Sequence, residues 1–449
     1  MKYNSRSFIN LFLLLSTFVL LISCQKRDND HTNDHGNLTK TYSSDVLKEW
    51  IKLDLQLLRS NETKLNNFVM MHHWAYSSIA LYEAVVPGMP SYQCLSGQLN
   101  EMPALPIREH NKDYHWPTCA NAVLAAMTKK FYLDSITQGG KDSITLLEET
   151  LNAIYKTEVD ATIFERSKAF GTEIAARVFN WALTDGYITA NPAYVLPLGE
   201  GQWQRTPPGF LSPQRPYWGL NRPLMAGSVK ATQLSSPPAY SGDPKSAFYG
   251  YVKEVYDLRN SVSSDEQAQV LFWRDVPGGG HAHWLSIFLQ VLNQEGSRAM
   301  LDKAALVFAK MGITQSDARI SCWKAKYEYN LLRPVTYINA IISPQKNWNS
   351  FITTPNHPEY PSAHSSFSAP AAAVLTQEFG DNYSFTDHTY DFLSLPARTY
   401  KSFTHAATEA GNSRVLGGLH YRFSITAGNH LGDGIANYMN QHIRFNKGK

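Results

Sequence analysis

The chain has little of several features that mark particular protein classes. It has four cysteines in 449 residues and no CxxC pair, so zinc and thiol redox sites of that type are not expected. With 41 basic and 38 acidic residues, its net charge of +3 is too small for a protein whose main partner is nucleic acid. No run of 18 apolar residues follows residue 23, so no transmembrane helix is expected in the mature chain.

The N-terminus has the pattern of an export signal. Lys2 and Arg6 precede an apolar stretch of about a dozen residues, which is too short to span a bilayer. The four residues that end at Cys24 resemble a bacterial lipobox, with an ordinary secretory signal as the alternative. We therefore expect a lipoprotein signal peptide at 1–23, a lipid on Cys24 and a polar tether over 24–42. The protein is then an exported bacterial lipoprotein of the outer membrane, periplasm or cell surface.

The three remaining cysteines allow one disulfide. Cys94 and Cys119 are 25 residues apart, and export would permit a bond between them, which would be worth roughly 3 kcal/mol. Cys322 lies in a helical pattern and is expected to be core.

Helical periodicity dominates the body of the chain. Apolar residues from Ser44 to Leu58 recur at spacings of three and four, which is typical of an amphipathic helix. The predicted fold is all-α, with two helical bundles at 43–260 and 261–449 and a long Pro- and Gly-rich connection over 187–245. Similar periods predict helices over 115–133, 143–156, 162–183, 283–293, 299–311, 316–332 and 424–443.

Three clusters of charged and polar residues follow one another in the second half. In the first, Lys326 and Arg333 are seven residues apart, which on one α-helix places both cations on nearly the same face. Trp323 precedes Lys326 by three residues, and Pro334 is expected to end the helix. By itself, such a pair of cations is more often a solvated helix face than an anion site.

The second cluster combines a helix start with two histidines. It runs from His357 through Ser362 and Ala363 to His364, and a helical stretch follows over 365–378. A Pro-Ser opening leaves free backbone N–H groups at the helix N-terminus, where an anion is stabilised. Ser362 can donate its hydroxyl to such an anion, and His364 can act as a general acid or base.

The third cluster adds a cation and a histidine. Arg414 is followed six residues later by His420, which on a continuous helix lies about 120° away and so approaches a shared anion from another side. Gly417 and Gly418 between them permit close backbone approach. In isolation, a core histidine beside a surface arginine explains this cluster better than an anion site does.

In order, spacing and residue type, the three clusters resemble the superfamily of vanadium-dependent haloperoxidases and type 2 phosphatidic acid phosphatases. The resemblance covers residues 323–424 and implies an all-α fold like that of vanadium chloroperoxidase, with the active site in the C-terminal bundle. It implies that vanadate is the cofactor and that His420 supplies the nitrogen that bonds vanadium, or attacks phosphorus in a phosphatase. It also implies that His364 is the acid–base group. The implied ligands of the vanadate oxygens are Lys326, Arg333, Ser362, the amide of Ala363, His364 and Arg414.

Two positions depart from the family pattern. Ala363 stands where relatives have glycine, which requires a negative φ at this position. Ser424 stands four residues after His420, where many relatives have an aspartate that orients the histidine. The sequence therefore leaves open which group orients His420.

Several features favour the peroxidase over the phosphatase. The chain is longer than a minimal phosphatase bundle, and the segments 272–275 and 280–284 resemble a bacterial haloperoxidase pattern in which Asp275 would support the site. We expect hydrogen peroxide and halide as substrates, with Lys326 polarising the peroxide. Iodide is expected first because it is the easiest halide to oxidise. His357 matches bromoperoxidases and makes bromide possible and chloride poor, whereas Trp323 matches chloroperoxidases and argues the other way. The alternatives are an acid phosphatase with His420 as nucleophile and an inactive anion- or partner-binding lipoprotein.

Overall fold

The protein, seen here in a computed structural model, is built almost entirely from helices. The structure describes residues 38–60, 64–132, 134–259, 261–274, 276, 282–344 and 347–448. The signal peptide, Cys24, Asp275 and His281 therefore lie outside the described residues.

The α-helices are α1 (Asp45–Arg59), α2 (Asn67–Val85), α3 (Trp116–Tyr132), α4 (Gln138–Tyr155), α5 (Ala161–Ala182), α6 (Ser228–Ala231), α7 (Ala247–Arg259), α8 (Ser264–Phe272), α9 (His283–Glu295), α10 (Leu301–Tyr329), α11 (Pro334–Tyr337), α12 (Ala363–Phe379), α13 (Phe403–Leu416) and α14 (Arg422–His442). Strands β1 (Phe385–Asp387) and β2 (Arg398–Tyr400) pair antiparallel, with Phe385 opposite Tyr400. The all-α prediction is confirmed for this part of the chain.

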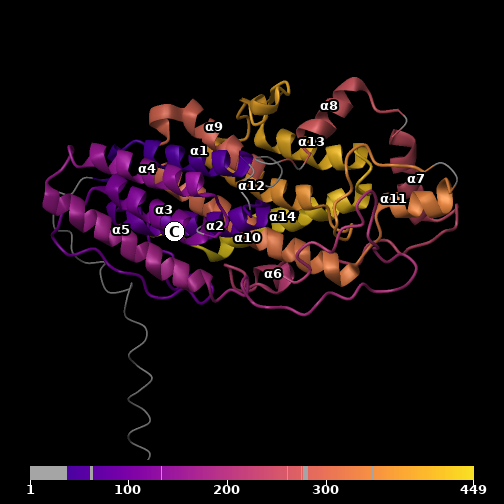
Figure 1. The fold of residues 1–449 in the computed structure, drawn as a ribbon, viewed down its shortest axis with the longest axis horizontal. Helices are drawn as coiled ribbons and strands as arrows, with labels where there is room; N and C mark the ends of the chain where they lie inside the picture. The colour runs from indigo at the N-terminus through magenta and orange to yellow at the C-terminus, as the bar shows by residue number, and fades with distance from the viewer. Residues whose placement is uncertain are drawn as a thin grey trace, which may run out of the picture.

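The helices form an elongated molecule in which α10 runs through the middle (Figure 1). Helices α1 to α5 gather at one end, and α2 packs on both α3 and α10. Toward the other end, α12 lies between α10, α13 and α14. The C-terminus returns to the N-terminal helices, where the backbone N–H of Lys447 donates to the carbonyl oxygen of Ser91.

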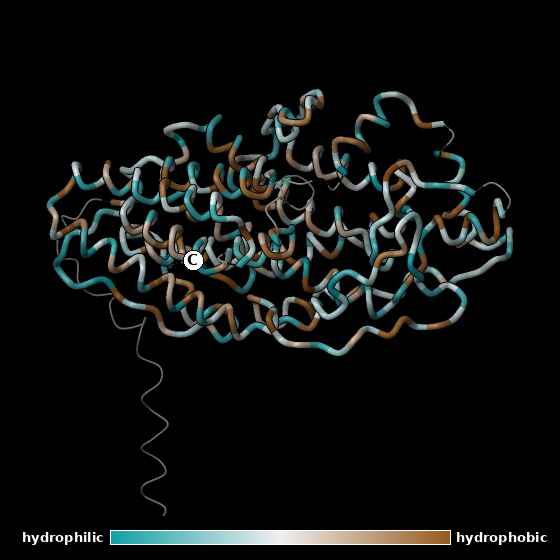
Figure 2. The backbone as a smooth tube through the Cα atoms, in the orientation of Figure 1, coloured by the Kyte–Doolittle hydropathy of each residue, from teal (hydrophilic) through white to brown (hydrophobic). Residues whose placement is uncertain are grey.

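Outer helices follow the amphipathic pattern, whereas the central ones do not. Along α1 the buried side chains include Leu47, Trp50 and Ile51, and the tube of the outer helices alternates between hydrophilic and hydrophobic colours (Figure 2). Helix α2 is buried at every position from Met70 to Val85. A helix buried on all sides has no polar face and hence no 3.6-residue period, which is why periodicity did not predict it.

Helix α10 corrects the predicted arrangement of the first cluster. The two helices predicted over 299–311 and 316–332 are one helix, which ends where Asn330 adopts a left-handed conformation with φ 45°. Arg333 therefore does not lie on the same helix as Lys326; it follows an extended stretch. Pro334 does not end the helix but occupies the first position of α11, where its missing N–H costs nothing.

The third cluster also lies across a helix break. Helix α13 ends at Leu416, Gly418 has φ +79°, and α14 begins at Arg422. His420 therefore lies in the short connection between α13 and α14. The prediction that it shares a continuous helix with Arg414 is wrong. The break is tied back to the helix, because the N–H of Leu419 donates to the carbonyl oxygen of Arg414 at 2.9 Å.

Close packing of α14 on α12 fixes where α12 starts. A Cβ atom on Gly428 would lie 2.6 Å from the carbonyl oxygen of Ser362, so only glycine fits there. The N–H of Ser362 donates to the carbonyl oxygen of Ser424 on α14 at 3.0 Å.

The cysteines and the long connection complete the description. Cys119 is a free thiol and fully buried, so the disulfide with Cys94 that the sequence allowed is not formed; Cys322 is buried core, as predicted. Between α5 and α7 the chain contains only the 3₁₀-helix Trp218–Leu220 and α6. In the part of the chain that the structure describes, every helix falls short of the length and apolarity that crossing a membrane requires.

Candidate active site

Lys326 lies in the last turn of α10 and points at the backbone before α12. Its Nζ donates to the carbonyl oxygens of Pro358 and Glu359, each at 3.0 Å, and of Pro361 at 2.5 Å. The side chain is completely buried, and burial lowers the pKa of Lys326 to about 7. This ammonium group therefore stands in a site with little water, where its attraction for an anion is strong.

Arg333 connects the second and third clusters. Its Nε donates to the carbonyl oxygen of His357 at 3.0 Å, and its Nη1 donates to that of Leu419 at 2.9 Å. The same Nη1 lies 3.1 Å from His420 Nε2, and Nη2 lies 3.0 Å from His357 Nδ1. Burial lowers the pKa of Arg333 to about 10, so it is charged at neutral pH. The helix break at Asn330 thus carries Arg333 to the histidines.

His420 is oriented by Glu359, a residue to which the sequence gave no role. Its Nδ1 lies 2.8 Å from Glu359 Oε1, and both side chains are at most 3% exposed. The N–H of Tyr421 and the hydroxyl of Ser424 also donate to Glu359, at 2.9 and 2.7 Å. Ser424 therefore acts on His420 indirectly, by holding the carboxylate that replaces the expected aspartate.

These contacts define the state of the His420 ring. Burial and the positive charges of Arg333 and Lys326 hold the pKa of His420 well below its usual value, so the ring is neutral. Nδ1–H donates to Glu359, which leaves the Nε2 lone pair facing the Arg333 guanidinium. Burial raises the pKa of Glu359 to about 7, against the hydrogen bond from Ser424 and the charge of Arg333. The arrangement gives His420 one nitrogen that can bond an electrophilic centre.

The start of α12 lies as the sequence predicted. Ser362 is the N-cap, and its Oγ accepts from the N–H and the hydroxyl of Ser365, at 3.4 and 3.2 Å. Since Oγ accepts in both bonds, the hydrogen of the Ser362 hydroxyl remains for another acceptor, such as an anion. Ala363 is the first helical residue and is not among those with positive φ, so alanine is compatible with this position.

His364 and Arg414 meet the C-terminal end of α8. His364 Nε2 donates to the carbonyl oxygen of Trp273 at 2.8 Å. Arg414 is 2% exposed; its Nε donates to Ser413 Oγ at 3.0 Å and its Nη2 to the carbonyl oxygen of Val270 at 3.4 Å. The charge of Arg414 also lowers the pKa of His420, so it acts on the same pocket.

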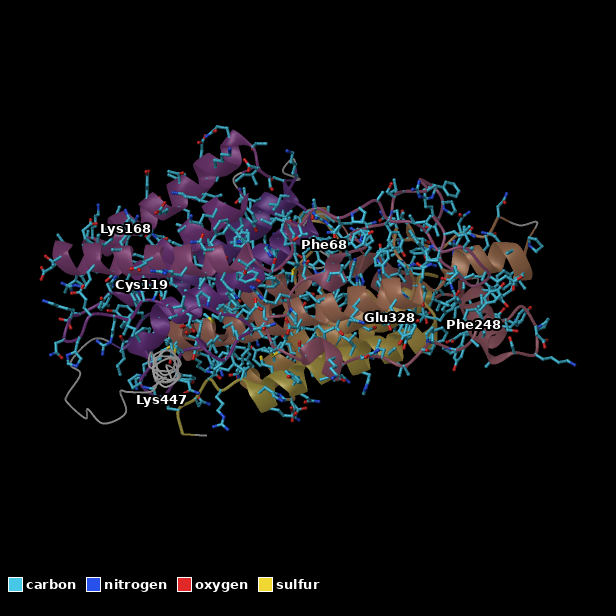
Figure 3. All side chains as sticks on the ribbon, turned by 90° about the horizontal axis from the view of Figure 1, so that it is seen from below. Phe68, Cys119, Lys168, Phe248, Glu328 and Lys447 are labelled. Atoms are coloured by element: carbon cyan, nitrogen blue, oxygen red, sulfur yellow. The ribbon has the colours of Figure 1, made fainter. Side chains whose placement is uncertain are left out.

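The two predicted halide-specificity residues are in contact with each other. The rings of Trp323 and His357 lie 5.1 Å apart, and both side chains are at most 5% exposed. Trp323 Nε1 donates to the carbonyl oxygen of Gln214 in the long connection at 3.2 Å. Phe68 of α2 lies 5.1 Å from the Trp323 ring and sits at the middle of the molecule in Figure 3, so the N-terminal helices support this wall of the site.

The donor set fits vanadate or phosphate. Lys326, Arg333 and Arg414 are each at most 2% exposed. Little water screens these buried positive charges, so an anion bound here would stabilise the group. The Ser362 hydroxyl and the amide groups that begin α12 can add hydrogen bonds, and His420 Nε2 can add the bond to the central atom.

Three other buried histidines, His72, His73 and His283, lie outside this group of residues. His283 Nε2 contacts Asp387 Oδ2 at 2.6 Å, with both side chains fully buried. In α2, His72 Nε2 contacts Asp185 Oδ2 at 2.7 Å, and His73 Nδ1 contacts the Ser77 hydroxyl at 2.8 Å. These histidines are packed into the core. Glu359 could have been noticed as the acidic residue between His357 and Ser362.

Comparisons with known proteins agree on fold and family. A family model described as the VCPO second helical-bundle domain matches residues 306–447. A solved bacterial vanadium-dependent iodoperoxidase is 31% identical with a TM-score of 0.81, and the match covers 90% of this chain and 97% of that one. The holo form of a bacterial vanadium-dependent chloroperoxidase is 13% identical with a TM-score of 0.62 over 85% of this chain and 94% of that one. At 13% identity, the chloroperoxidase match shows only that the two proteins share a fold. Among proteins of curated function, none matches this sequence significantly.

Proposed function

The chain belongs to the family of vanadium-dependent haloperoxidases, and from this premise we propose that it oxidises halide with hydrogen peroxide to hypohalous acid. The observation that carries the proposal is the group of three buried cations around His420, with Nδ1 held by Glu359 and Nε2 facing Arg333. The proposed site lies among α10, α12 and α14, in the C-terminal bundle.

Bound vanadate would supply a Lewis-acidic centre that activates peroxide toward attack by halide. Lys326, Arg333 and Arg414 would hold its oxygens, with the Ser362 hydroxyl and the N–H of Ala363 as further donors. His420 Nε2 would bond the metal, because Glu359 keeps the proton of this ring on Nδ1. Lys326 and Arg333 donate to backbone carbonyl oxygens and His420 Nε2 faces Arg333, so a bound anion would take over some of these contacts.

Proton movement is assigned to His364. Its Nε2–H is held by the carbonyl oxygen of Trp273, so the ring can accept or donate a proton through Nδ1. Lys326 adds a cation whose lowered pKa reflects a water-poor environment. In the proposed cycle Lys326 polarises the peroxide, and His364 moves the protons that peroxide binding and release of hypohalous acid require.

We propose iodide as the preferred halide, with bromide possible and chloride poor. His357 places a polar ring 3.0 Å from Arg333, which favours a wetter and less activating pocket than an apolar ring would. The iodoperoxidase relative supports the same order. Trp323, packed on His357, is the residue that argues for chloride.

A phosphatase is the second candidate, and Glu359 is the observation that favours it. A histidine nucleophile must be held and made basic, and Glu359 and Ser424 do both for His420. One preparation should therefore be divided, with half loaded with orthovanadate and half kept in buffer free of phosphate and vanadate. We expect iodide oxidation only in the loaded half. Phosphate-ester hydrolysis in the untreated half, without vanadate-dependent oxidation, would reverse the order, and inactivity in both would favour an anion-binding lipoprotein.

We also propose that Cys24 carries the lipid that anchors the exported protein. The support is the sequence alone, namely the apolar stretch and the lipobox-like residues that end at Cys24. The substitution Cys24→Ser should move the protein from the membrane fraction to the soluble one, without changing the thermal stability of the helical body. Wild-type protein that is soluble and has no acyl group at its mature N-terminus would contradict this.

A further inference from the structure

The backbone at the end of α8 fixes the proton of His364. Helix α8 starts with a capping box, in which the Ser263 hydroxyl accepts from the N–H of Glu266 and the Glu266 carboxylate accepts from the N–H of Ser263. Its C-cap is Trp273, whose carbonyl oxygen lies 2.8 Å from His364 Nε2. A carbonyl oxygen can only accept, so in the neutral ring the hydrogen is on Nε2 and Nδ1 is the acceptor.

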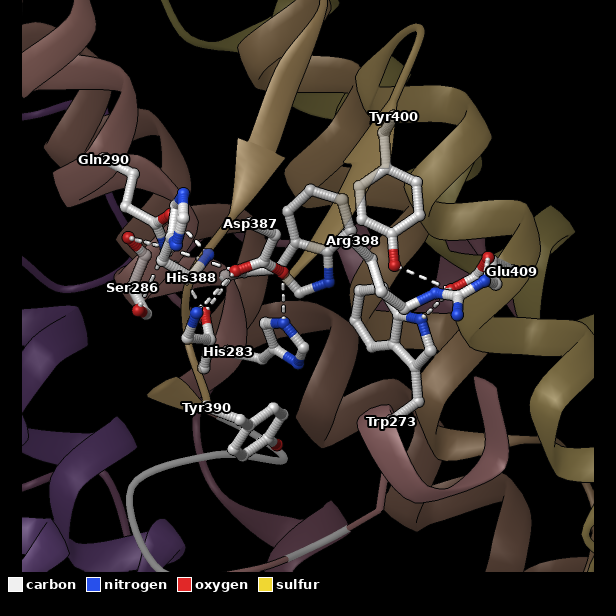
Figure 4. A network of polar contacts seen from close by, with 12 residues as sticks. Trp273, His283, Ser286, Gln290, Asp387, His388, Tyr390, Arg398, Tyr400 and Glu409 are labelled. Carbon is white, nitrogen blue, oxygen red and sulfur yellow. Dashed lines mark hydrogen bonds and ion pairs between the residues drawn. The ribbon is translucent and has the colours of Figure 1, made fainter. Parts of the chain in front are cut away.

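The side chain of Trp273 is clamped at its indole N–H (Figure 4). Trp273 is 1% exposed, and its Nε1 donates to Glu409 Oε1 at 3.0 Å. Arg398 of β2 donates to both oxygens of Glu409, from Nε at 2.8 Å and from Nη2 at 2.9 Å. The Tyr400 hydroxyl donates at 2.7 Å. These hydrogen bonds hold the Glu409 carboxylate in one position, and the carboxylate in turn fixes the orientation of the Trp273 indole.

A second group holds the face of the same indole. The His283 ring stacks on Trp273 with 4.1 Å between centroids and 23° between planes. His283 is fixed in turn by Asp387 at 2.6 Å, and Asp387 accepts from the Thr389 hydroxyl at 2.6 Å and from Gln290 at 3.2 Å. Figure 4 shows both groups on either side of Trp273. The last turn of a helix normally frays. The contacts of Glu409 and His283 with the Trp273 side chain oppose fraying at the C-terminal end of α8.

We propose that Glu409 and Trp273 are positioning residues for His364: by clamping the end of α8 they aim the Trp273 carbonyl oxygen and keep the proton of His364 on Nε2, so that Nδ1 performs the proton transfer. The proposal rests on the proposed function only in taking His364 as the acid–base group. Neither side chain needs to touch the bound anion or the substrates. Displacement of a catalytic group by about 1 Å can cost about 10²-fold in rate, so such a clamp has a measurable effect.

Two substitutions loosen the clamp without emptying the core. Trp273→Phe removes the indole N–H but keeps an aromatic ring against His283. Glu409→Gln keeps the size of the side chain but removes the charge that Arg398 and Tyr400 surround. Trp50→Phe is the matched control, because Trp50 is also 1% exposed and donates its Nε1–H to Asn121 Oδ1 at 2.9 Å, in the N-terminal helices.

The first readout needs no vanadate and no activity. Histidine ¹⁵N spectra of the vanadate-free protein, at a pH where imidazole is neutral, report which ring nitrogen carries hydrogen, and His364→Ala identifies the resonances. In the wild type and in Trp50→Phe, His364 should carry its hydrogen on Nε2. In Trp273→Phe and Glu409→Gln, a mixture of both tautomers should appear. A wild-type hydrogen on Nδ1, or the same spectrum in all four proteins, would overturn the proposal.

The second readout separates positioning from general destabilisation. With vanadate bound, kcat for iodide should fall about 10-fold in Trp273→Phe and Glu409→Gln, within the range seen for supporting partners of catalytic groups. KM for iodide and the vanadate affinity should stay within about twofold, because the contacts of Lys326, Arg333 and His420 with the anion are untouched. A loss of kcat that tracks the fall in melting temperature across all variants, Trp50→Phe included, would overturn the proposal. If the wild type lacks vanadate-dependent oxidation, the proposed function fails, while the ¹⁵N spectra still decide the positioning role.

Discussion

The substitution Glu359→Gln tests how His420 is held and made basic. Glutamine has the same shape, and its amide oxygen can still accept from His420 Nδ1 and from the N–H of Tyr421, which lie 2.8 and 2.9 Å from Glu359 Oε1. Its amide NH₂ group can donate to Ser424, whose hydroxyl now lies 2.7 Å from Oε2. The fold should therefore survive, and the change that matters is the loss of a buried negative charge.

Two effects of that loss oppose each other. Without the carboxylate, His420 Nε2 is a poorer donor to a metal, and losses of this kind typically weaken metal binding by about 10- to 100-fold, or roughly 1.4–2.8 kcal/mol. Removing a negative charge also strengthens the attraction of the cations for any anion, by about 2 kcal/mol for charges about 8 Å apart at an effective dielectric constant of about 20. Only the first effect requires a bond from nitrogen to the central atom.

Titrations with vanadate and with phosphate at pH 8 separate the two effects, since Glu359, with a pKa of about 7, is mostly ionised there. In Glu359→Gln the two effects nearly cancel for vanadate, whereas phosphate affinity should rise by about 2 kcal/mol, so the ratio of vanadate to phosphate affinity should fall by about 10- to 100-fold. Glu83→Gln is the matched control: Glu83 is 4% exposed, and burial raises its pKa to about 7 as well. A ratio of vanadate to phosphate affinity that is the same in Glu359→Gln and in the wild type would refute the reasoning.

Three further predictions concern stability and halide choice. The folded-state pKa of Glu83 lies above its usual value, so the folded protein holds a proton that the unfolded chain releases, and stability falls as the pH rises from about 4.5 through 7. Glu83→Gln lacks this pH dependence, so its free energy of unfolding relative to that of the wild type should rise by up to roughly 3 kcal/mol from pH 5 to pH 8. Urea denaturation at both pH values measures this. A difference between the two proteins that is the same at pH 5 and pH 8 would contradict the prediction. Gly428→Ala should destabilise the fold by about 1–3 kcal/mol, because its Cβ would lie 2.6 Å from the carbonyl oxygen of Ser362; a wild-type melting temperature would argue against this packing. His357→Phe should raise the ratio of bromide to iodide turnover, and steady-state rates with both halides that leave this ratio unchanged would show that His357 does not set the preference.

The sequence predicted which residues form the candidate site better than it predicted the helices that position them. Lys326 and Arg333 were placed on one helix by their spacing, but the helix ends at Asn330, whose left-handed conformation redirects the chain. His420 was placed around a helix from Arg414, but Gly418 breaks that helix as well. In each case a single residue with positive φ overrides periodicity, and such a choice depends on what the following segment packs against.

Glu359 shows a different limit of sequence reasoning. The group that orients His420 was sought four residues later in the sequence, where Ser424 stands. The structure instead brings the carboxylate from the segment before α12, 61 residues earlier, and uses Ser424 to hold it. A pair this far apart is joined by tertiary packing, so a local pattern could draw attention to Glu359 but could not pair it with His420. Helix α2 escaped notice for a related reason, since complete burial removes the period that marks a helix.

The most direct test of the central claim, that His420 and the surrounding cations hold vanadate, is equilibrium dialysis of orthovanadate against the wild type and His420→Ala. The wild type should bind one vanadate per chain. His420→Ala should retain none after buffer exchange, because the remaining contacts form no bond to the central atom and the anion can exchange with the buffer. Its melting temperature should stay close to that of the wild type. Full retention of vanadate by His420→Ala would contradict the account, because some other group would then have to provide the bond assigned to His420 Nε2.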